Sequence, residues 1–425
     1  MTAASTLSAG HATDAAVWPV DDLLRRVLRA LDLALTVVEA FGHDGYEDPV
    51  HPELGFGPEK VVAEAAMLAY AAGTSTDDPR VAARVARLTS ALGPLARSDE
   101  ALADLLVHPF RVTKRVVPHV LLRELGLPHD AFDAVAAPRF ERLLRFSCEA
   151  PQPVMAERAW IARRWSGADA AFVDPHGPFS KPFDLADHSR EFAYGLTHLI
   201  FYVTDFGREP GVVLGRRVDE LLRDVDALVL RYLDAADYDL VAELLTAWPM
   251  LRQPWSATAR FAWRVLTAAE DAVGVLPCFN LDLDRLDALA PAEQTRYARA
   301  MSYHTALVMG LLCAVSLRDG ATPVRRISAD AGSAAVADEV FALLAPNGAH
   351  WPDEFAKLDP AERAALGPAL VRLGLLRAVR NADAPSIQRL LALAERQGIA
   401  LGPVGAMAVD LMGALSGAAR FAGEP

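Results

Sequence analysis

The sequence predicts an all-α protein, built either as an irregular multi-helix domain or as an α/α toroid of helical hairpins. Three observations support this class. Apolar residues recur at positions i, i+3, i+4 and i+7 in nearly every ordered segment, which is the period of an amphipathic helix. Strand-like alternation is confined to the short segment 278–283. No fixed-period repeat of the tetratricopeptide or ankyrin kind is found, which disfavours a solenoid.

Proline and glycine mark the ends of the predicted helices in the first part of the chain. Gly42 follows a helix that begins near residue 20, and Pro58 suits the first position of a helix that Gly73 ends. Pro118 is expected to bend a later helix. The helices predicted in this part are 20–41, 58–73, 77–95, 100–107, 110–126, 130–136, 139–149 and 153–167.

Segment 168–182 separates two groups of predicted helices. It contains Gly, Pro, Phe and His without periodicity, so it is the best candidate for a domain junction or a functional loop. We expect a disordered tail over 1–18, an N-terminal helical part over 19–167 and a C-terminal part with the candidate site over 187–422. One continuous domain is the alternative. The later helices are predicted at 187–207, 214–234, 238–248, 258–273, 291–317, 333–344, 360–379, 385–397 and 403–421.

The composition indicates a folded, cytoplasmic protein. Of its 425 residues, 52% are hydrophobic and 23% are charged, which suits a chain with a large core. A net charge of −13 repels phosphate backbones, so no nucleic-acid partner is expected. Cys148, Cys278 and Cys313 stand apart from one another, as is typical of free thiols in a reducing compartment. Residues 1–16 lack the basic and apolar regions of a signal peptide.

Segment 300–317 raises the question of a membrane. It is uncharged between Arg299 and Arg318, and its length lies at the lower limit for a membrane span. It carries several Ser, Thr, Tyr and His residues, and no second segment of similar length supports a membrane protein. We interpret it as the most buried helix of a soluble protein and expect no membrane partner.

The segment 187–207 is expected to form one helix with a polar stripe on an apolar rod. Glu191, His198 and Asp205 recur every seven residues, so they fall on nearly the same side of a helix. Seven residues span about 10.5 Å of helix, so the three side chains cannot bind one ion together. The segment therefore predicts one wall of a cavity. The alternative is that His198 is a hydrogen-bonded core histidine and Asp205 caps the helix end.

Two further residues are candidates for the opposite walls of this cavity. His304 lies in the most apolar predicted helix, and we place it across the cavity from His198, where the two imidazoles are candidate metal ligands. Glu64 stands between alanines near the apolar side of its helix and is a candidate general base or ligand. The alternatives are a satisfied core histidine at position 304 and an arginine-paired carboxylate at position 64.

The standard signatures of nucleotide enzymes and hydrolases are absent from the sequence. It contains no Walker A loop, no GxGxxG turn, no HExxH and no GxSxG elbow. The triplet at 205–207 matches the Asp-Phe-Gly of protein kinases, but no glycine-rich loop or His-Arg-Asp motif accompanies it. A nucleotide-dependent enzyme of a standard type is therefore not expected.

The run YGLTHLIFYVTDFG at 194–207 resembles a segment in a group of actinobacterial all-helical proteins, with the pattern Tyr-x-x-Thr-His…Thr-Asp-Phe-Gly. The runs at 58–68 and 303–312 are similar to that group too, so the resemblance covers most of the chain. It implies a helical protein encoded among specialised-metabolism genes. It implies no reaction, because no activity is known for the group.

Two functional predictions follow from these residues. The first is an enzyme that acts on a small molecule or modified peptide, by acid–base or metal-assisted chemistry in a cavity lined by Glu64, Glu191, His198, Asp205 and His304. In its metal-assisted form, His198 and His304 bind a divalent ion whose identity stays open. The alternative is a non-catalytic helical scaffold or a ligand- or peptide-binding protein. Substrate and oligomeric state are not predicted.

Overall fold

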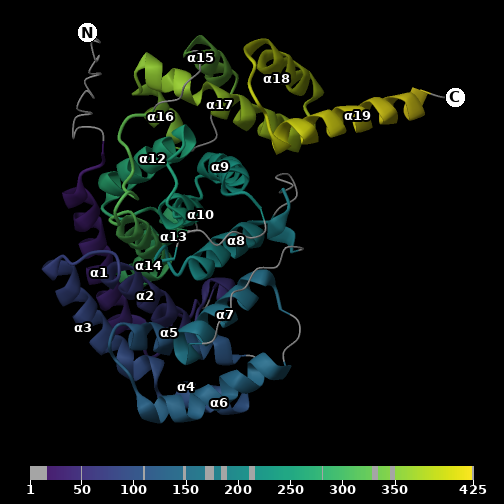
Figure 1. Ribbon diagram of the computed structural model, residues 1–425. Coiled ribbons are helices and arrows are strands. Elements are labelled where there is room, and N and C mark those ends of the chain that lie inside the picture. Colours follow the sequence, from purple (N-terminus) through teal and green to yellow (C-terminus); the bar gives the residue numbers. More distant parts are fainter. Residues whose placement is uncertain are drawn as a thin grey trace, which may run out of the picture.

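The computed structural model describes residues 17–423, apart from 49, 109–110, 147–149, 168–176, 183–188, 210–215, 280, 328–333 and 345–349. Within these residues the chain is a succession of helices joined by turns (Figure 1). The strand-like pairings of the described part are two isolated bridges, Val17 with Val324 and Tyr46 with Phe56. The predicted all-α class is therefore confirmed.

The helices of the N-terminal part occupy the lower half of Figure 1. Helix α2 lies at their centre and packs against α1, α3 and α5, and α5 in turn packs against α6 and α7. One prediction is wrong here, because α6 continues through Pro138 instead of dividing into two helices. These helices are α1 (Val20–Phe41), α2 (Pro58–Gly73), α3 (Pro79–Ala96), α4 (Asp99–Val107), α5 (Val112–Glu124), α6 (Asp130–Phe146) and α7 (Gln152–Ser166).

The next group of helices packs directly on the N-terminal part. Helix α14 lies along α1 and α2 on one side and along α10 on the other, so the two parts share one apolar core. Most of segment 168–182 lies outside the described residues. These helices are α8 (Arg190–Val203), α9 (Val218–Asp234), α10 (Tyr238–Leu245), α11 (Ala247–Leu251), α12 (Ala257–Val273), α13 (Leu283–Ala288) and α14 (Pro291–Val315).

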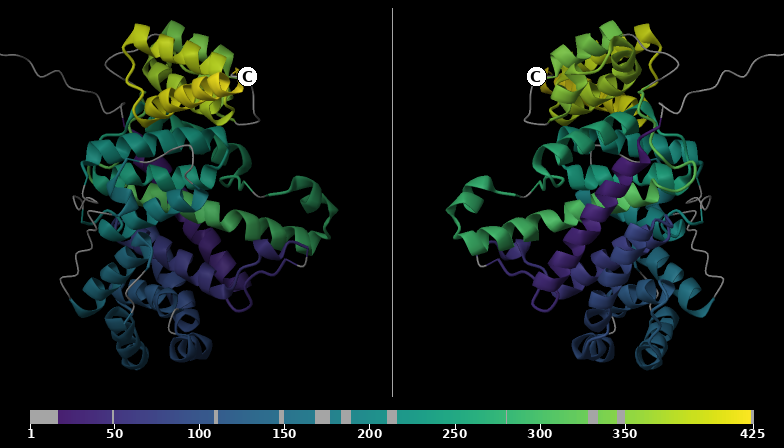
Figure 2. Two further views of the ribbon diagram at one scale, coloured as in Figure 1. Left: turned by 90° about the vertical axis from the view of Figure 1, so that its right-hand side faces the viewer. Right: turned by 90° about the vertical axis from the view of Figure 1, so that its left-hand side faces the viewer.

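The last helices form a cap above α9 and α12 (Figures 1 and 2). Helix α17 connects this cap to the body, because it packs against α9 and α12 as well as against α15, α18 and α19. The cap consists of α15 (Ala334–Leu343), α16 (Trp351–Ala356), α17 (Pro360–Arg380), α18 (Ala384–Gln397) and α19 (Pro403–Gly423).

Helix α13 and the beginning of α14 project from the body as an arm, which the side views show clearly (Figure 2). Polar contacts tie this arm to the segment that follows α1. Arg285 Nη2 lies 2.6 Å from Asp48 Oδ1, and the Arg296 guanidinium stacks over the ring of Tyr46. These contacts hold the arm against the segment between α1 and α2.

The helices that carry the site begin at residues that are typical helix start signals. Pro58 and Pro291 occupy the first turns of α2 and α14, where a missing N–H leaves no helical hydrogen bond unmade. The Ser189 hydroxyl accepts a hydrogen bond from Phe192 N at the start of α8. The Asp237 carboxylate caps α10 by accepting from Leu240 N at 3.4 Å, and it also binds Arg190. These caps fix where each site residue stands along its helix.

Helix α8 is shorter than the predicted helix at 187–207. It ends at Val203, because Asp205, Phe206 and Gly207 all adopt positive φ values of 47°, 53° and 82°. Phe206 N donates to Phe201 O at 2.7 Å, which closes the helix end in the manner of a Schellman turn. Asp205 therefore leaves the helical period that was expected to align it with His198.

Helix α14 is the one described helix that is long and apolar enough to cross a membrane. Its most apolar window is 78% buried against other helices, as in the core of a folded protein. Gly310 permits this packing, since a Cβ atom there would lie 2.3 Å from the Cβ of Ala30 in α1. The packing agrees with the interpretation of segment 300–317 as a core helix.

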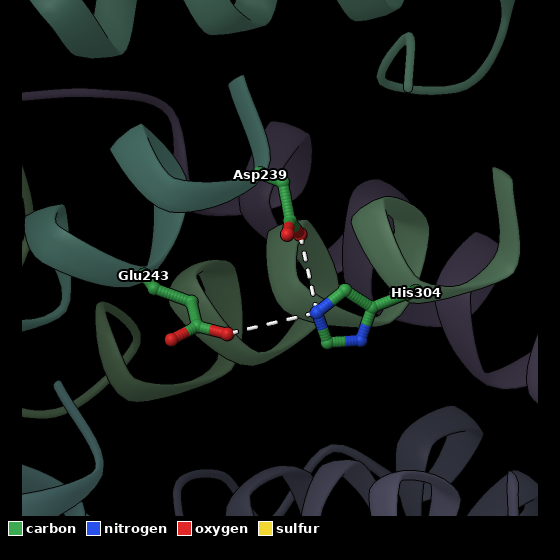
Figure 3. A group of neighbouring side chains, drawn as sticks. All are labelled: Asp239, Glu243 and His304. Atoms are coloured by element: carbon green, nitrogen blue, oxygen red, sulfur yellow. Dashed lines mark ion pairs between the residues drawn. The ribbon is translucent and has the colours of Figure 1, made fainter. Parts of the chain in front are cut away.

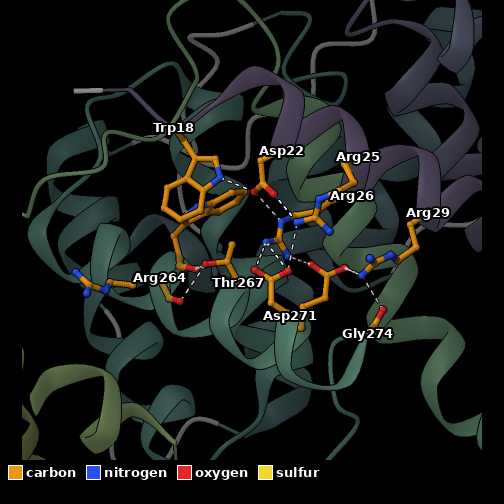
Figure 4. A network of polar contacts seen from close by, with 11 residues as sticks. Trp18, Asp22, Arg25, Arg26, Arg29, Arg264, Thr267, Asp271 and Gly274 are labelled. Carbon is orange, nitrogen blue, oxygen red and sulfur yellow. Dashed lines mark hydrogen bonds and ion pairs between the residues drawn. The ribbon is translucent and has the colours of Figure 1, made fainter. Parts of the chain in front are cut away.

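An ion-pair network joins α1 to α12 (Figure 4). Arg26 is only 1% exposed, and its guanidinium contacts the carboxylates of Asp22, Glu270 and Asp271. Asp22 also accepts a hydrogen bond from Trp18 Nε1 at 2.7 Å, and the Trp18 ring packs edge-on against Trp263. Residues 17 and 18, which were predicted to belong to a disordered tail, are thus ordered, whereas residues 1–16 lie outside the described part.

Candidate functional site

Helices α2, α8, α10 and α14 meet around a cavity of about 420 Å³. Each helix contributes ionisable side chains to its wall: Glu64 from α2, Tyr194 and His198 from α8, Asp239 and Glu243 from α10, and His304 from α14. Other parts of the wall are apolar and include Phe56, Phe279 and Met301. The cavity therefore combines a charged floor with apolar and aromatic sides, which is the usual character of a small-molecule site.

His304 is the centre of the charged floor (Figure 3). Its Nδ1 atom lies 3.1 Å from Oε2 of Glu64. Its Nε2 atom lies 3.3 Å from Oδ1 of Asp239 and 3.7 Å from Oε1 of Glu243. One imidazole ring is thus placed between three carboxylates, with one of them at Nδ1 and two at Nε2.

Asp239 and Glu243 reach His304 together because they are four residues apart on α10 and so share one side of that helix. Side chains of helix α8 bind the oxygen of each carboxylate that does not face His304. The Tyr194 hydroxyl donates to Oδ2 of Asp239, and the Thr197 hydroxyl donates to Oε2 of Glu243 at 2.5 Å. Each carboxylate therefore uses one oxygen to bind α8 and turns the other toward His304.

The close carboxylates shift the pKa values of the whole group. Burial alone lowers the pKa of His304, but Asp239 and Glu64 outweigh it and hold that pKa well above its ordinary value. Burial and, after it, the adjacent Asp239 raise the pKa of Glu243 to about 8, against the opposing effect of His304. Burial also acts to raise the pKa values of Glu64 and Asp239, yet the imidazolium keeps both of them below normal. Three acidic side chains therefore share one imidazolium.

His198 lines the same cavity, but its pKa is shifted in the opposite direction from that of His304. Its ring is open to the cavity, while the surrounding protein and the charge of His304 lower its pKa to about 4. The ring lies nearly parallel to that of Phe201, with the centroids 5.7 Å apart. His198 is consequently a neutral imidazole at neutral pH, able to accept or donate one hydrogen bond to a bound molecule.

Three of the five residues predicted from the sequence lie around this cavity, namely Glu64, His198 and His304. Glu191 does not join them: it is exposed in the first turn of α8, outside the described lining of the cavity. The stripe expected on α8 is therefore reduced to His198, with Tyr194 one turn before it.

Asp205 is fully buried in a separate network beyond the end of α8. Its Oδ1 accepts hydrogen bonds from Tyr70 OH at 2.9 Å and from Trp160 Nε1 at 2.7 Å. Its Oδ2 contacts the guanidinium of Arg164 and lies 3.3 Å from Nη1 of Arg208. Because every oxygen has protein partners, the carboxylate holds α2, α7 and the turn after α8 together.

Sequence reasoning missed Asp239 and Glu243. They stand in the run YDLVAELL at 238–245, where all the remaining residues are apolar or aromatic, and both are at least 95% buried. Two carboxylates at i and i+4 in an apolar helix carry the same signal that drew attention to His198. That signal was available in the sequence, because unpaired carboxylates are costly to bury.

Among the described residues, Asp239, Glu243 and His304 offer ligand atoms that all lie within 4.8 Å of one another. Two carboxylate oxygens and one imidazole nitrogen form a donor set that divalent metal ions accept. The His198–His304 pair predicted from the sequence is different, since His198 is not in this group. Cations stand nearby as well, with Lys60 Nζ 3.9 Å from Glu64 Oε1 and Arg190 Nη2 3.7 Å from Asp239 Oδ2.

Comparison with known proteins identifies a family but gives no activity. No curated protein and no solved structure matches this chain. Residues 15–314 match the family model described as "Domain of unknown function (DUF6895)", and the chain therefore belongs to this family.

Proposed function

We propose that the chain is an enzyme that acts on a small molecule or modified peptide in the cavity between α2, α8, α10 and α14. The observation that carries the proposal is the convergence of Glu64, Asp239 and Glu243 on the imidazole of His304 at the cavity floor. This group supports acid–base or metal-assisted chemistry, because it places proton donors and acceptors where a bound molecule has access.

The placement of two acidic side chains at one imidazole nitrogen, beside a cavity, favours a catalytic group over a structural one. At the cavity, three carboxylates surround one imidazole, and Asp239 and Glu243 turn toward the same nitrogen atom. Acidic groups so close compete for one imidazolium at a cost in stability, and folds keep such arrangements mainly at functional sites.

The sides of the cavity favour a substrate with an apolar or aromatic portion. Phe279 and Phe56 lie in the wall, and each has a cation near its ring: Arg190 at 5.8 Å from the Phe279 centroid, and Lys60 at 5.8 Å from that of Phe56. A molecule seated between them would contact both rings while its reacting group faces His304. Neutral His198 supplies a further hydrogen bond within the same space.

Every residue of this site lies within residues 15–314, which match the family. The proposal therefore concerns the helical body and does not depend on the cap of α15–α19. A role in specialised metabolism and a cytoplasmic location stay predictions from the sequence, and so does the alternative of a ligand-binding protein without catalysis.

The test is an untargeted turnover measurement. Purified full-length protein is incubated with a mixture of small-molecule metabolites and short modified peptides, with and without added divalent ions, and mass spectrometry follows which species disappear and which form. We expect at least one substrate–product pair with the wild type and none with His304→Gln. Glu191→Gln, an exposed change outside the cavity, is the matched control and should retain turnover.

Two outcomes would contradict the proposal. One is equal turnover by wild type and His304→Gln, which would remove the cavity from the chemistry. The other is an absence of turnover together with saturable binding of a mixture component, which would favour the ligand-binding alternative. Circular dichroism and thermal unfolding of each variant separate a loss of function from a loss of the fold.

A further inference from the structure

We infer that Asp239, Glu243 and His304 form a binding site for one divalent transition-metal ion, with Glu64 as the carboxylate that orients the imidazole. This inference deepens the proposed function, because it selects metal-assisted chemistry at the same site. It replaces the His198–His304 ligand pair that the sequence suggested.

The distances between the ligand atoms suit one ion. Metal–ligand bonds of about 2.1 Å place neighbouring ligand atoms about 3.0 Å apart in octahedral geometry and about 3.4 Å apart in tetrahedral geometry. His304 Nε2 lies 3.3 Å from Asp239 Oδ1 and 3.7 Å from Glu243 Oε1. These two distances lie within a few tenths of an ångström of the tetrahedral spacing, and all three ligand atoms lie within 4.8 Å of one another.

The ligand atoms are free to coordinate. Oδ1 of Asp239 is buried and makes no hydrogen bond within the described part of the chain, where its close partner is the His304 ring. The other oxygen of each carboxylate is held by α8, through Tyr194 for Asp239 and Thr197 for Glu243. This arrangement fixes the carboxylates while their remaining oxygens point at the same place, as preorganised metal ligands do.

Glu64 occupies the position of an outer carboxylate. Its Oε2 lies 3.1 Å from Nδ1 of His304, on the side of the ring opposite to Asp239 and Glu243. A carboxylate at this nitrogen keeps the proton on Nδ1 and leaves the lone pair of Nε2 for the ion, which is the carboxylate–histidine–metal arrangement. The geometry thus gives Glu64 a positioning role, with no bond to the metal.

The donor set indicates which ions bind. One nitrogen and two carboxylate oxygens favour Mn²⁺, Fe²⁺ or Zn²⁺ over Mg²⁺, which prefers oxygen alone. The ligands come from one side, α10 and α14, and the cavity lies beside them. Water or substrate can therefore complete the coordination sphere from the cavity, as in catalytic metal sites with three protein ligands.

The test measures metal binding and needs no substrate. Full-length protein stripped with a chelator is titrated with Mn²⁺, and separately with Zn²⁺ and Mg²⁺, by isothermal titration calorimetry. We expect one Mn²⁺ or Zn²⁺ per chain and weaker Mg²⁺. His304→Gln and Glu243→Gln should abolish this binding, whereas Glu64→Gln should weaken it by about 10–100-fold, the usual effect of removing an outer carboxylate. Glu191→Gln is the control and should bind as the wild type does.

Pulsed electron paramagnetic resonance of the Mn²⁺ form gives a readout independent of affinity. The wild type should show coupling to an imidazole nitrogen. In Glu64→Gln, saturated with Mn²⁺, the coupling should persist, because His304 remains a ligand there. A structural role for Glu64 predicts no change in affinity in a variant that folds normally.

The inference is overturned if the wild type binds no Mn²⁺ or Zn²⁺ stoichiometrically, or if folded Glu243→Gln and His304→Gln bind the ions unchanged. These outcomes differ from failure of the proposed function. Turnover that depends on His304 without any bound ion would refute the metal site and support an acid–base enzyme. One bound ion per chain without turnover would support the metal site and contradict the proposed enzymatic function.

Discussion

Asp239 on α10 places its Oδ1 atom 3.3 Å from Nε2 of His304 on α14. Around this contact, three further residues from two other helices fix the geometry: Glu64 at the other ring nitrogen, and Tyr194 and Thr197 behind the carboxylates of α10. The predictions below ask which polar groups of the protein serve this site and which serve the fold.

Glu243→Gln should stabilise the protein while it removes ion binding. Glu243 is 2% exposed and faces the same imidazole nitrogen as Asp239, and its pKa is raised to about 8. Glutamine has the same shape and no charge, so it avoids the cost of protonating this carboxyl group on folding at neutral pH. The amide oxygen can still accept the hydrogen bond from Thr197. We expect the free energy of unfolding in chelator to rise by about 0.5–2 kcal/mol, measured by urea denaturation. A loss of more than about 1 kcal/mol would instead mark Glu243 as structural.

Asp205→Asn should show the opposite pattern. Asparagine tolerates the positive φ of 47° at this position, so the change isolates the loss of the carboxylate charge beside Arg164 and Arg208. Breaking this buried pairing should cost about 2–4 kcal/mol of unfolding free energy, measured by urea denaturation. Mn²⁺ affinity of the folded variant should equal that of the wild type. A marked loss of Mn²⁺ affinity without a loss of stability would indicate that Asp205 belongs to the functional site.

Arg26→Met tests the network between α1 and α12 (Figure 4). Methionine fills similar space but removes the guanidinium in direct contact with Glu270, which is only 5% exposed, and leaves it the more distant guanidinium of Arg29, with Nη1 at 3.8 Å. We expect a loss of about 3–5 kcal/mol, seen as a lower urea midpoint. The double variant Arg26→Met with Glu270→Met should recover much of this loss, because it removes the uncompensated charge. A single variant as stable as the wild type would refute a structural role for this network.

His119 should make the stability depend on pH. The ring is fully buried, Nδ1 accepts a hydrogen bond from Arg97 Nε at 3.0 Å, and Nε2 lies 2.8 Å from Oδ1 of Asp133. Burial lowers the pKa of His119 in the folded state even though Asp133 opposes this, so between the folded and unfolded pKa values the unfolded chain binds more protons. This contribution to stability is present above the unfolded pKa of about 6.5 and is lost as the pH falls below it.

His119→Gln provides the comparison for this pH effect. Glutamine can accept from Arg97 and donate to Asp133, but it does not titrate. The wild type should lose more unfolding free energy than the variant between about pH 7.5 and 5.5, with a difference in slope of at most about 1.4 kcal/mol per pH unit. Parallel pH profiles for the two proteins would show that His119 does not carry this dependence.

The sequence was sufficient for the local features of the fold. Helix α1 has the predicted bounds, 20–41, because its apolar period is strong and Gly42 follows it. Pro58 and Pro291 likewise open α2 and α14 as predicted. The errors arise where the local sequence is compatible with either a continuous or an interrupted helix. Helix α6 continues through Pro138, and helix α8 ends at Val203 because the residues of the following turn adopt positive φ values.

The site was predictable only in part, because tertiary packing decides which side chains meet. His304 and Glu64, chosen because they are ionisable residues within apolar helices, both line the cavity. The seven-residue spacing failed for Asp205, since that residue lies beyond the helix and pairs with arginines of other segments. The partners of His304 on α10 depend on the packing of α10 against α14, which periodicity within one helix does not reveal.

The most direct test of the central claim is an anomalous-scattering measurement on crystals of the full chain soaked in Mn²⁺. The account predicts one anomalous peak per chain, about 2.1–2.3 Å from Nε2 of His304 and from a carboxylate oxygen of both Asp239 and Glu243, with Glu64 at Nδ1 and not bound to the ion. A soaked crystal with no peak at this position, or with a peak whose ligands exclude His304, would contradict it.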